Sequence, residues 1–241
     1  MGRALALFYG VVCYAVFFVV FLYAIWFVWT MDRPAAQTPL TQALLIDTGL
    51  LLLFAVQHSG MARQGFKRVW IRVVPQPVER STYVLAASLA LLVVCLFWQP
   101  MPSVIWQLDL APVQYLLYAF FWLGWALVFA STFLIDHFDL FGLKQVWRYW
   151  SGKTYQPPAF HTPGIYRFVR HPLYLGFLIA FWSAPYMTLG HLYFSGVTTA
   201  WILVAIQFEE RDLVTYHGEE YKLYRSGVSM LVPWPGKKHQ D

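Results

Sequence analysis

Long apolar runs separated by short polar segments make up the first 135 residues of the chain. Four of these runs are 17 to 25 residues long. A helix needs about 20 apolar residues to cross the hydrocarbon core of a bilayer. We therefore predict four transmembrane helices, over Leu5–Trp29, Leu40–Val56, Thr82–Trp98 and Val113–Ile135. No small-residue cleavage site follows the first run, which favours a membrane span over a removable signal peptide.

Two further apolar runs follow a polar segment at 136–171. Leu173–Gly190 and His191–Phe208 each contain 18 residues, with Pro185 and Gly190 between their centres. This pattern predicts a tight helical hairpin and a total of five or six membrane helices. Each run is close to the lower length limit for a span, so the sequence leaves open whether the hairpin crosses the bilayer fully.

The segment between the second and third runs, Gln57–Ser81, is basic. Pro75 and Pro77 within it are expected to break any helix there. Asp47, inside the second run, is either a functional acid or a partner for a neighbouring helix.

Lys and Arg gather in alternate segments between the runs. Five lie at 57–81, five at 136–171 and five in the tail after 208, whereas the segment at 99–112 and the hairpin turn have none. Four spans followed by an in-and-out hairpin place all three basic segments on one side. By the positive-inside rule, this side and both chain ends are predicted to be cytoplasmic.

The composition agrees with an integral membrane protein. Hydrophobic residues make up 59% of the chain and charged residues only 12%, against about 25% charged in a typical soluble domain. Cys13 and Cys95 lie in apolar runs, which favours small hydrophobic side chains over a disulfide, and no metal-ligand spacing involves them. The cations are spread over three segments without a recognised fold to present them, so nucleic-acid binding is not expected.

Charged, aromatic, Gly and Pro residues crowd together at 161–176. Arg170 and His171 come directly before Pro172, which suits the first turn of a helix. Cations just outside a helix N-terminus favour a carboxylate or phosphate ligand. The alternative is an orientation anchor with aromatic residues at the interface.

An acidic pair, Glu209-Glu210, follows the predicted hairpin, so it is expected at the same membrane face as Arg170 and His171. Together the two pairs suit a zwitterionic ligand, with Arg170 and His171 on its carboxylate. The alternative is that Glu209 simply begins a solvated helix.

The motif Gly164-Ile-Tyr166-x-x-x-Arg170-His171-Pro172-x-Tyr174-x-Gly176, with the acidic pair and Gly218-x-x-Tyr221-x-x-Tyr224, resembles the isoprenylcysteine carboxyl methyltransferase superfamily. These membrane enzymes use S-adenosylmethionine (SAM). The resemblance covers roughly residues 160–235 and implies a single domain over 1–241, with a membrane part at 5–135 and a cofactor-binding part at 136–241. The residues that it implies as SAM contacts are Tyr166, Arg170, His171, Pro172, Tyr174, Gly176, Glu209 and Glu210.

Three further segments, Gln57–Arg63, Pro77–Tyr83 and Ser131–Leu143, resemble bacterial methanethiol S-methyltransferases, which are similar to the NnrU-type membrane proteins. With them the resemblance spans nearly the whole chain. Asp136 departs from the amide expected in this family, so its charge is not expected to be required.

Methylation of a thiol proceeds through the thiolate, so a base or a cationic environment must favour that form. His58 and His137 titrate in the right range and are predicted at cytoplasmic ends of spans. Asp139 and Glu79 could orient such a histidine, and Arg80 with Glu79 forms a second candidate pair. Interfacial hydrogen bonding is the alternative role for each histidine.

The sequence thus predicts an all-α methyltransferase of the bacterial plasma membrane that uses SAM on a small thiol such as methanethiol. Two alternatives stay open: a larger lipid or prenylated substrate, and a non-catalytic NnrU-like partner of a redox complex. The sequence leaves the oligomeric state open.

Overall fold

The computed structural model describes residues 1–31 and 38–233, and most of these are helical. The predicted first loop therefore lies largely outside the described residues. The chain divides into two compact units. The first contains Met1–Ser103 and Asp136–Pro157, and the second contains Val104–Ile135 and Pro158–Asp241.

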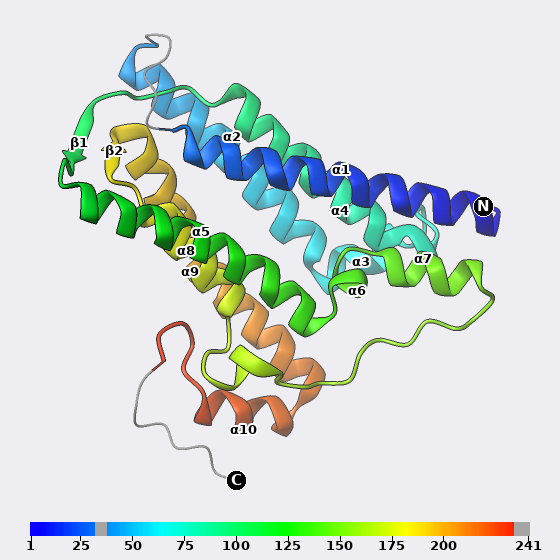
Figure 1. Cartoon of the computed structure of the whole chain (residues 1–241). Helices are drawn as coiled ribbons and strands as arrows, with labels where there is room; N and C mark the ends of the chain where they lie inside the picture. Colours follow the sequence, from blue (N-terminus) through cyan, green and yellow to red (C-terminus); the bar gives the residue numbers. More distant parts are fainter. Residues whose placement is uncertain (32–37, 234–241) are drawn as a thin grey trace. The chain divides into compact units, whose positions relative to one another are not determined.

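The first unit is built on three long helices with three short ones at one end. Its helices are α1 (Arg3–Trp29), α2 (Leu40–Ala62), α3 (Gln64–Trp70), α4 (Gln76–Phe97), α6 (His137–Leu140) and α7 (Leu143–Trp150). Helix α4 packs against both α1 and α2, and α7 packs on α1 and α4 (Figure 1). Ala6, Val78 and Val146 are buried where α1, α4 and α7 meet. Apolar burial in this contact holds the three helices together.

The two middle helices of the first unit are longer than predicted. Helix α2 continues to Ala62, six residues beyond the predicted end, and α4 begins at Gln76, six residues before the predicted start. Pro75 takes the N-cap position and Pro77 lies in the first turn, where no intrahelical donor is needed. The prediction that Pro77 breaks a helix was therefore wrong; the helix break lies between α3 and α4.

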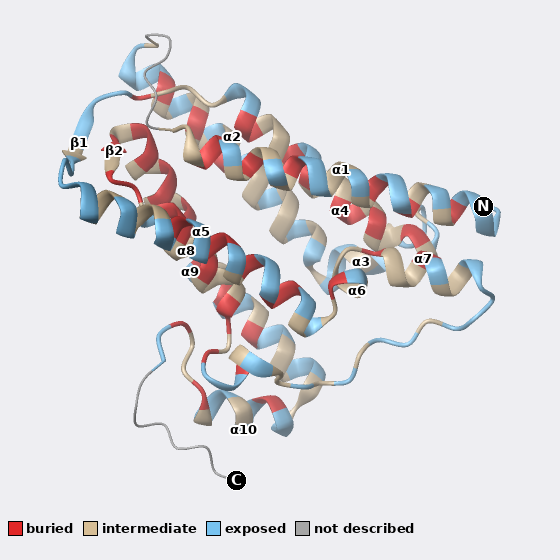
Figure 2. Ribbon diagram, in the orientation of Figure 1, coloured by how far each residue is buried: buried red, intermediate tan, exposed pale blue. Residues whose placement is uncertain are grey.

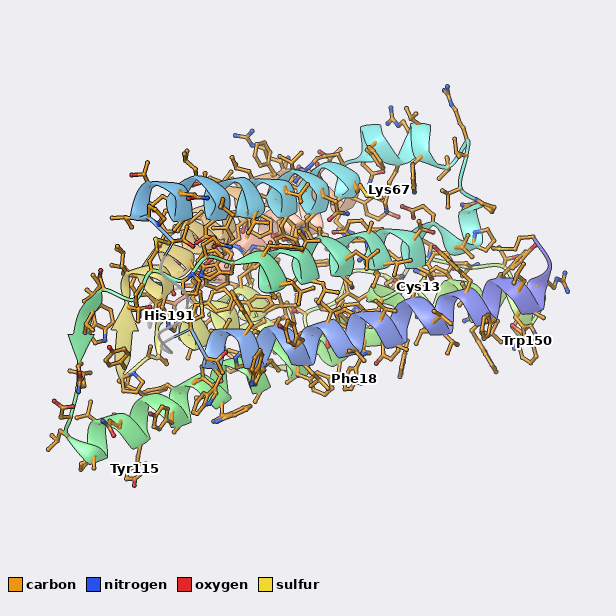
Figure 3. All side chains as sticks on the ribbon, turned by 90° about the horizontal axis from the view of Figure 1, so that it is seen from above. Cys13, Phe18, Lys67, Tyr115, Trp150 and His191 are labelled. Carbon is orange, nitrogen blue, oxygen red and sulfur yellow. The ribbon has the colours of Figure 1, made fainter. Side chains whose placement is uncertain are left out.

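Helices α3 and α7 place basic and aromatic side chains at the same end of the first unit as the start of α1. Figure 3 shows Lys67 on α3 and Trp150 at the end of α7 at this end. At the opposite end of α2, Asp47 is completely buried, and its Oδ1 accepts a hydrogen bond of 2.8 Å from the backbone N–H of Gln99. Asp47 thus pairs with the segment that follows α4, which is the structural alternative for this acid.

In the second unit α8 packs against both α5 and α9 (Figure 1). Its elements are β1 (Val104–Gln107), α5 (Ala111–Ile135), the 3-10 helix η1 (Gly164–Arg167), α8 (Pro172–Trp182), β2 (Tyr186–Thr188), α9 (Leu189–His217) and α10 (Glu219–Gly227). Strands β1 and β2 pair antiparallel, with Val104 opposite Thr188. Buried residues concentrate where α5, α8 and α9 meet (Figure 2).

Two glycines bring α5 and α8 into backbone contact. A Cβ atom at Gly176 would lie 2.7 Å from the carbonyl oxygen of Gly124 and 2.8 Å from the backbone nitrogen of Val128. A Cβ at Gly124 would lie 2.6 Å from the backbone nitrogen of Ala180. Only residues without a side chain permit this approach, which is how closely packed membrane helices generally associate.

The predicted hairpin is present but its two arms are unequal. Helix α8 has only 11 residues because the turn lies at 183–188 rather than at Gly190. Helix α9 has 29 because it begins at Leu189 and continues nine residues beyond Phe208. Eleven helical residues span about 17 Å, and the residues that follow include the short strand β2. Strand β2 pairs with β1, and β1 lies directly before α5. Helix α8 and the residues up to β2 therefore extend as far as the N-terminal end of α5.

Five helices of the described residues are long and apolar enough to cross a membrane: α1, α2, α4, α5 and α9. Helix α8 is a shorter apolar helix. Large apolar side chains such as Val19, Leu45 and Tyr115 point outward, with 64%, 71% and 72% of their surface exposed. Such surfaces suit lipid and not water. The prediction of an all-α integral membrane protein with five or six membrane helices is confirmed.

Candidate functional site

A buried charge cluster lies in the second unit, where α8 begins and α9 nears its end. The Nε of Arg170 donates to Oε1 of Glu210 at 2.7 Å, and Nε2 of His171 lies 3.1 Å from the same oxygen. The three side chains are only 4–8% exposed. The Glu210 carboxylate therefore contacts both residues that precede α8. With Arg170 it forms a buried ion pair.

Arg170 also holds the end of the described chain. Its Nη1 donates to the carbonyl oxygen of Arg225 at 3.0 Å and to that of Val228. The backbone N–H groups of Arg170 and His171 donate to the carbonyls of Ser229 and Met230 at 2.8 and 3.1 Å. This set of bonds fastens the segment after α10 to the start of α8.

Glu209, beside this cluster, makes a separate contact. Its Oε2 accepts a hydrogen bond of 2.8 Å from the hydroxyl of Tyr174, which lies on the first turn of α8. Glu209 is half-buried, in contrast to Glu210. Of the two carboxylates, Glu209 is thus the one whose surface is open to a ligand.

The other cofactor candidates have clear local roles. Pro172 is buried in the first turn of α8, as its missing N–H allows. Gly176 is buried against the backbone of α5. The hydroxyl of Tyr166 donates to the carbonyl of Ser131 at 3.4 Å. Burial raises the pKa of Tyr166, so its hydroxyl stays protonated as a donor.

Four aromatic side chains gather beside the charge cluster. The ring of Phe160 contacts the rings of His217, Tyr221 and Tyr224. The hydroxyl of Tyr224 donates to the carbonyl of Tyr166 at 2.6 Å, and burial raises the pKa of Tyr224 to about 12. The hydroxyl of Tyr221 is buried and has no hydrogen-bond partner among the residues that the structure describes.

The five catalytic candidates lie in the first unit. His137 is 2% exposed, and its Nε2 lies 2.8 Å from the hydroxyl of Tyr14. The rings of Phe138 and Phe141 meet it edge-on. Asp139 accepts a hydrogen bond of 3.1 Å from the hydroxyl of Tyr155 and so supports the loop after α7.

Burial lowers the pKa of His137. The unfolded chain, with an ordinary histidine pKa of about 6.5, therefore takes up a proton at this site before the folded protein does. Stability from this group is complete above pH 6.5 and falls as the pH decreases. We expect the melting temperature of wild type to fall more between pH 7.5 and 5.5 than that of His137→Gln, measured by thermal shift in detergent. Equal decreases would contradict this prediction.

His58 lies in the last two turns of α2. Its ring is 5.7 Å from that of Tyr83, whose hydroxyl donates to the carbonyl of His58 at 3.3 Å. The guanidinium of Arg80 lies over the ring of Tyr83, and its Nε donates to the carbonyl of Leu140 at 2.7 Å. Glu79 instead lies 3.9 Å from Lys67. Arg80 and Glu79 therefore have separate partners.

Asp136, the residue that departs from the expected amide, stabilises the start of α6. Its Oδ1 accepts the backbone N–H of Asp139 at 3.1 Å, and its Oδ2 pairs with Lys144. An amide oxygen can serve the first contact equally well. That its charge is dispensable stays a prediction.

Comparison with known proteins assigns the family. The chain is 52% identical over 240 residues to the methanethiol S-methyltransferase of Mycobacterium tuberculosis, covering 98% of this chain and 98% of that protein. It is 51% identical over 243 residues to the methanethiol S-methyltransferase of Crocosphaera subtropica, covering 99% and 95%. The chain belongs to the methanethiol S-methyltransferase family.

This family member is also similar, at lower identity, to proteins of another name. It is 32% identical over 176 residues to the protein named nurim from Sus scrofa, covering 69% of this chain and 66% of that protein. No family model matches the chain. No solved structure matches it either.

The structure of this methanethiol S-methyltransferase family member adds residues that the sequence did not single out. Phe160 and His217 belong to no motif, and only the fold brings their rings together. Tyr221 and Tyr224 stood in the resembling motif without an assigned role, although their spacing of three already predicts neighbouring positions on one helix. Arg225 lies 4.0 Å from Oε2 of Glu210.

Proposed function

We propose that this protein methylates methanethiol to dimethyl sulfide with SAM as the methyl donor. The observation that carries the proposal is the identity of 51–52% over nearly the full chain to two methanethiol S-methyltransferases. The names of these relatives favour a small thiol over a prenylated substrate. They equally favour an enzyme over a non-catalytic partner.

The residues of the second unit fit a zwitterionic nucleoside cofactor. A half-buried carboxylate, Glu209, is held in place by Tyr174. A buried hydroxyl, that of Tyr221, lacks a partner among the described residues. Carboxylates accept hydrogen bonds from ribose hydroxyls or an ammonium group. We propose that Tyr166, Tyr174 and Glu209 line the site, and that Arg170, His171, Pro172, Gly176 and Glu210 hold it in shape.

SAM supplies a methyl group on a sulfonium, and its transfer to a thiolate leaves S-adenosylhomocysteine and dimethyl sulfide. The protein must position the reactants, exclude water and favour loss of the thiol proton. His58 and His137 remain our candidates for holding that proton, and Asp139, Glu79 and Arg80 remain further candidates for catalytic residues. Of the two histidines, His137 is buried among aromatic rings, surroundings that suit a small apolar thiol.

We further propose that both chain ends face the cytoplasm of a bacterial plasma membrane. The three basic segments of the chain support this orientation. SAM then reaches the protein from the cytosol, while methanethiol, being small and apolar, reaches it through the bilayer.

Titration of SAM into the detergent-purified full chain tests the proposal. We expect saturable binding by wild type, binding at least tenfold weaker for Glu209→Gln, and wild-type binding for Glu219→Gln, whose carboxylate is exposed on α10. With methanethiol present, dimethyl sulfide should appear in the headspace, whereas a prenylated cysteine should remain unmethylated. A folded wild-type protein that binds no SAM would contradict the proposal.

A further inference from the structure

The hydroxyl of Tyr221 is an exception among the buried hydroxyls of the second unit that the structure describes. Tyr221 is only 2% exposed, and its hydroxyl lacks a hydrogen-bond partner within residues 1–31 and 38–233. Nearly all buried hydroxyls in native proteins are paired, because an unpaired one lowers stability. Phenylalanine would fill the same space without this cost. The hydroxyl is therefore a candidate for contact with a ligand.

Tyr221 belongs to a group of three rings, His217, Tyr221 and Tyr224, which we call the aromatic nest. The ring of Phe160 packs into the nest, with its centroid 5.0, 5.8 and 5.5 Å from the three rings in that order. Phe160 comes from residues 153–163, which form neither helix nor strand. A flat ring on an irregular segment thus occupies a site whose walls come from the end of α9 and from α10.

The aromatic nest adjoins the charge cluster. Burial raises the pKa of Tyr221, and the charges of Glu210, Arg170 and Glu209 act on it as well. These groups therefore lie close to its hydroxyl. Aromatic rings stack on the faces of purines, and a tyrosine adds a polar handle to such a surface. A ligand with a purine at one end and charged groups at the other fits both features.

We propose that the aromatic nest binds the adenosyl end of SAM, and that the Phe160 ring gives way when this end enters. The inference rests on the proposed function and adds residues that the motif resemblance did not imply. The nucleoside takes the place of the Phe160 ring, and the hydroxyl of Tyr221 gains a partner from it. Tyr224 keeps its bond to the carbonyl of Tyr166 and acts as a wall of the nest.

The test compares two hydroxyl deletions on one helix in the full chain. Loss of one hydrogen bond to the ligand should weaken SAM binding by Tyr221→Phe about tenfold, measured by calorimetry in nanodiscs. Its melting temperature without SAM should equal or exceed that of wild type. Tyr224→Phe, which loses the hydrogen bond to the carbonyl of Tyr166, should instead lower the melting temperature by about 2–4 °C.

5′-Methylthioadenosine, which lacks the amino-acid end of SAM, identifies the half that Tyr221 contacts. Its binding should weaken in Tyr221→Phe by the same factor as that of SAM. SAM affinity within twofold of wild type in Tyr221→Phe would overturn the proposal. A loss for SAM without a loss for 5′-methylthioadenosine would overturn the adenosyl assignment.

Phe160→Ala tests whether the ring must leave. We expect SAM to bind at least as tightly as to wild type, because no ring has to be displaced, with Phe168→Ala as an exposed control. Weaker binding would show that Phe160 supports the bound cofactor and would overturn the displacement. Wild-type protein that binds SAM but makes no dimethyl sulfide would count against the proposed function while leaving this inference standing.

Discussion

Replacement of Glu210 by alanine is expected to destabilise the second unit by about 3–5 kcal/mol, the usual result of removing one partner from a buried ion pair. The carboxylate that it removes contacts both Arg170 and His171. Arg170 would keep its bonds to the Arg225 and Val228 carbonyls but would lose its counter-charge. We expect Glu210→Ala to melt well below wild type, measured by thermal shift in detergent, and to lose SAM binding because Arg170 is left buried without its counter-charge.

Two comparisons separate this effect from a general loss of charge. Glu219→Ala removes an exposed carboxylate that pairs with Lys222 on the surface, so it should change stability by less than about 1 kcal/mol. Arg170→Ala in the Glu210→Ala background should cost less than in wild type, because the two residues share one interaction. Additive effects of the two substitutions would contradict the ion-pair assignment.

The second large effect is expected at the crossing of α5 and α8. In Gly176→Ala the new methyl group would lie 2.7–2.8 Å from backbone atoms of α5. Backbone cannot rotate aside as a side chain can, so the helices must separate. Overpacking of this kind costs about 1–3 kcal/mol and occasionally more. We expect the cost of Gly176→Ala to lie at the upper end of this range. It should appear as a lower melting temperature and as a smaller monodisperse peak on size-exclusion chromatography.

Gly196 provides a matched control on α9. A Cβ atom there meets nothing within 4 Å, so Gly196→Ala should be neutral or stabilise the helix by up to about 1 kcal/mol. Equal melting temperatures for the two glycine variants would show that the close approach of α5 and α8 does not limit stability.

The apolar runs predicted the helices well because hydrophobic length is a direct requirement of the bilayer. The boundaries were harder to predict. Pro77 was interpreted as a helix breaker, whereas the structure uses it at a helix start, and the same residue suits both positions. The turn of the hairpin moved to 183–188 because β2 pairs with β1, a partner about 80 residues earlier that no local pattern reveals.

The motif at 164–176 predicted that Arg170, His171 and the acidic pair lie together, but not the partner of each residue. Arg170 and His171 were expected on the carboxylate of a ligand, whereas in the structure both contact Glu210. Sequence shows which charges are near one another but not how they pair. Phe160 lies outside every motif, and its place among His217, Tyr221 and Tyr224 depends on how a chain segment without regular structure folds back.

The length of α9 sets the depth of the charged residues. Its first 20 residues, 189–208, are almost free of charge and rise about 30 Å, the thickness of a typical hydrocarbon core, and the last nine begin with Glu209 and Glu210. The apolar length of α9 therefore determines the depth of these carboxylates and places them at the lipid headgroups. A bilayer thicker by one helical turn would draw them into hydrocarbon, where an ionised group is costly. Hydrophobic mismatch would therefore change the surroundings of the charge cluster directly.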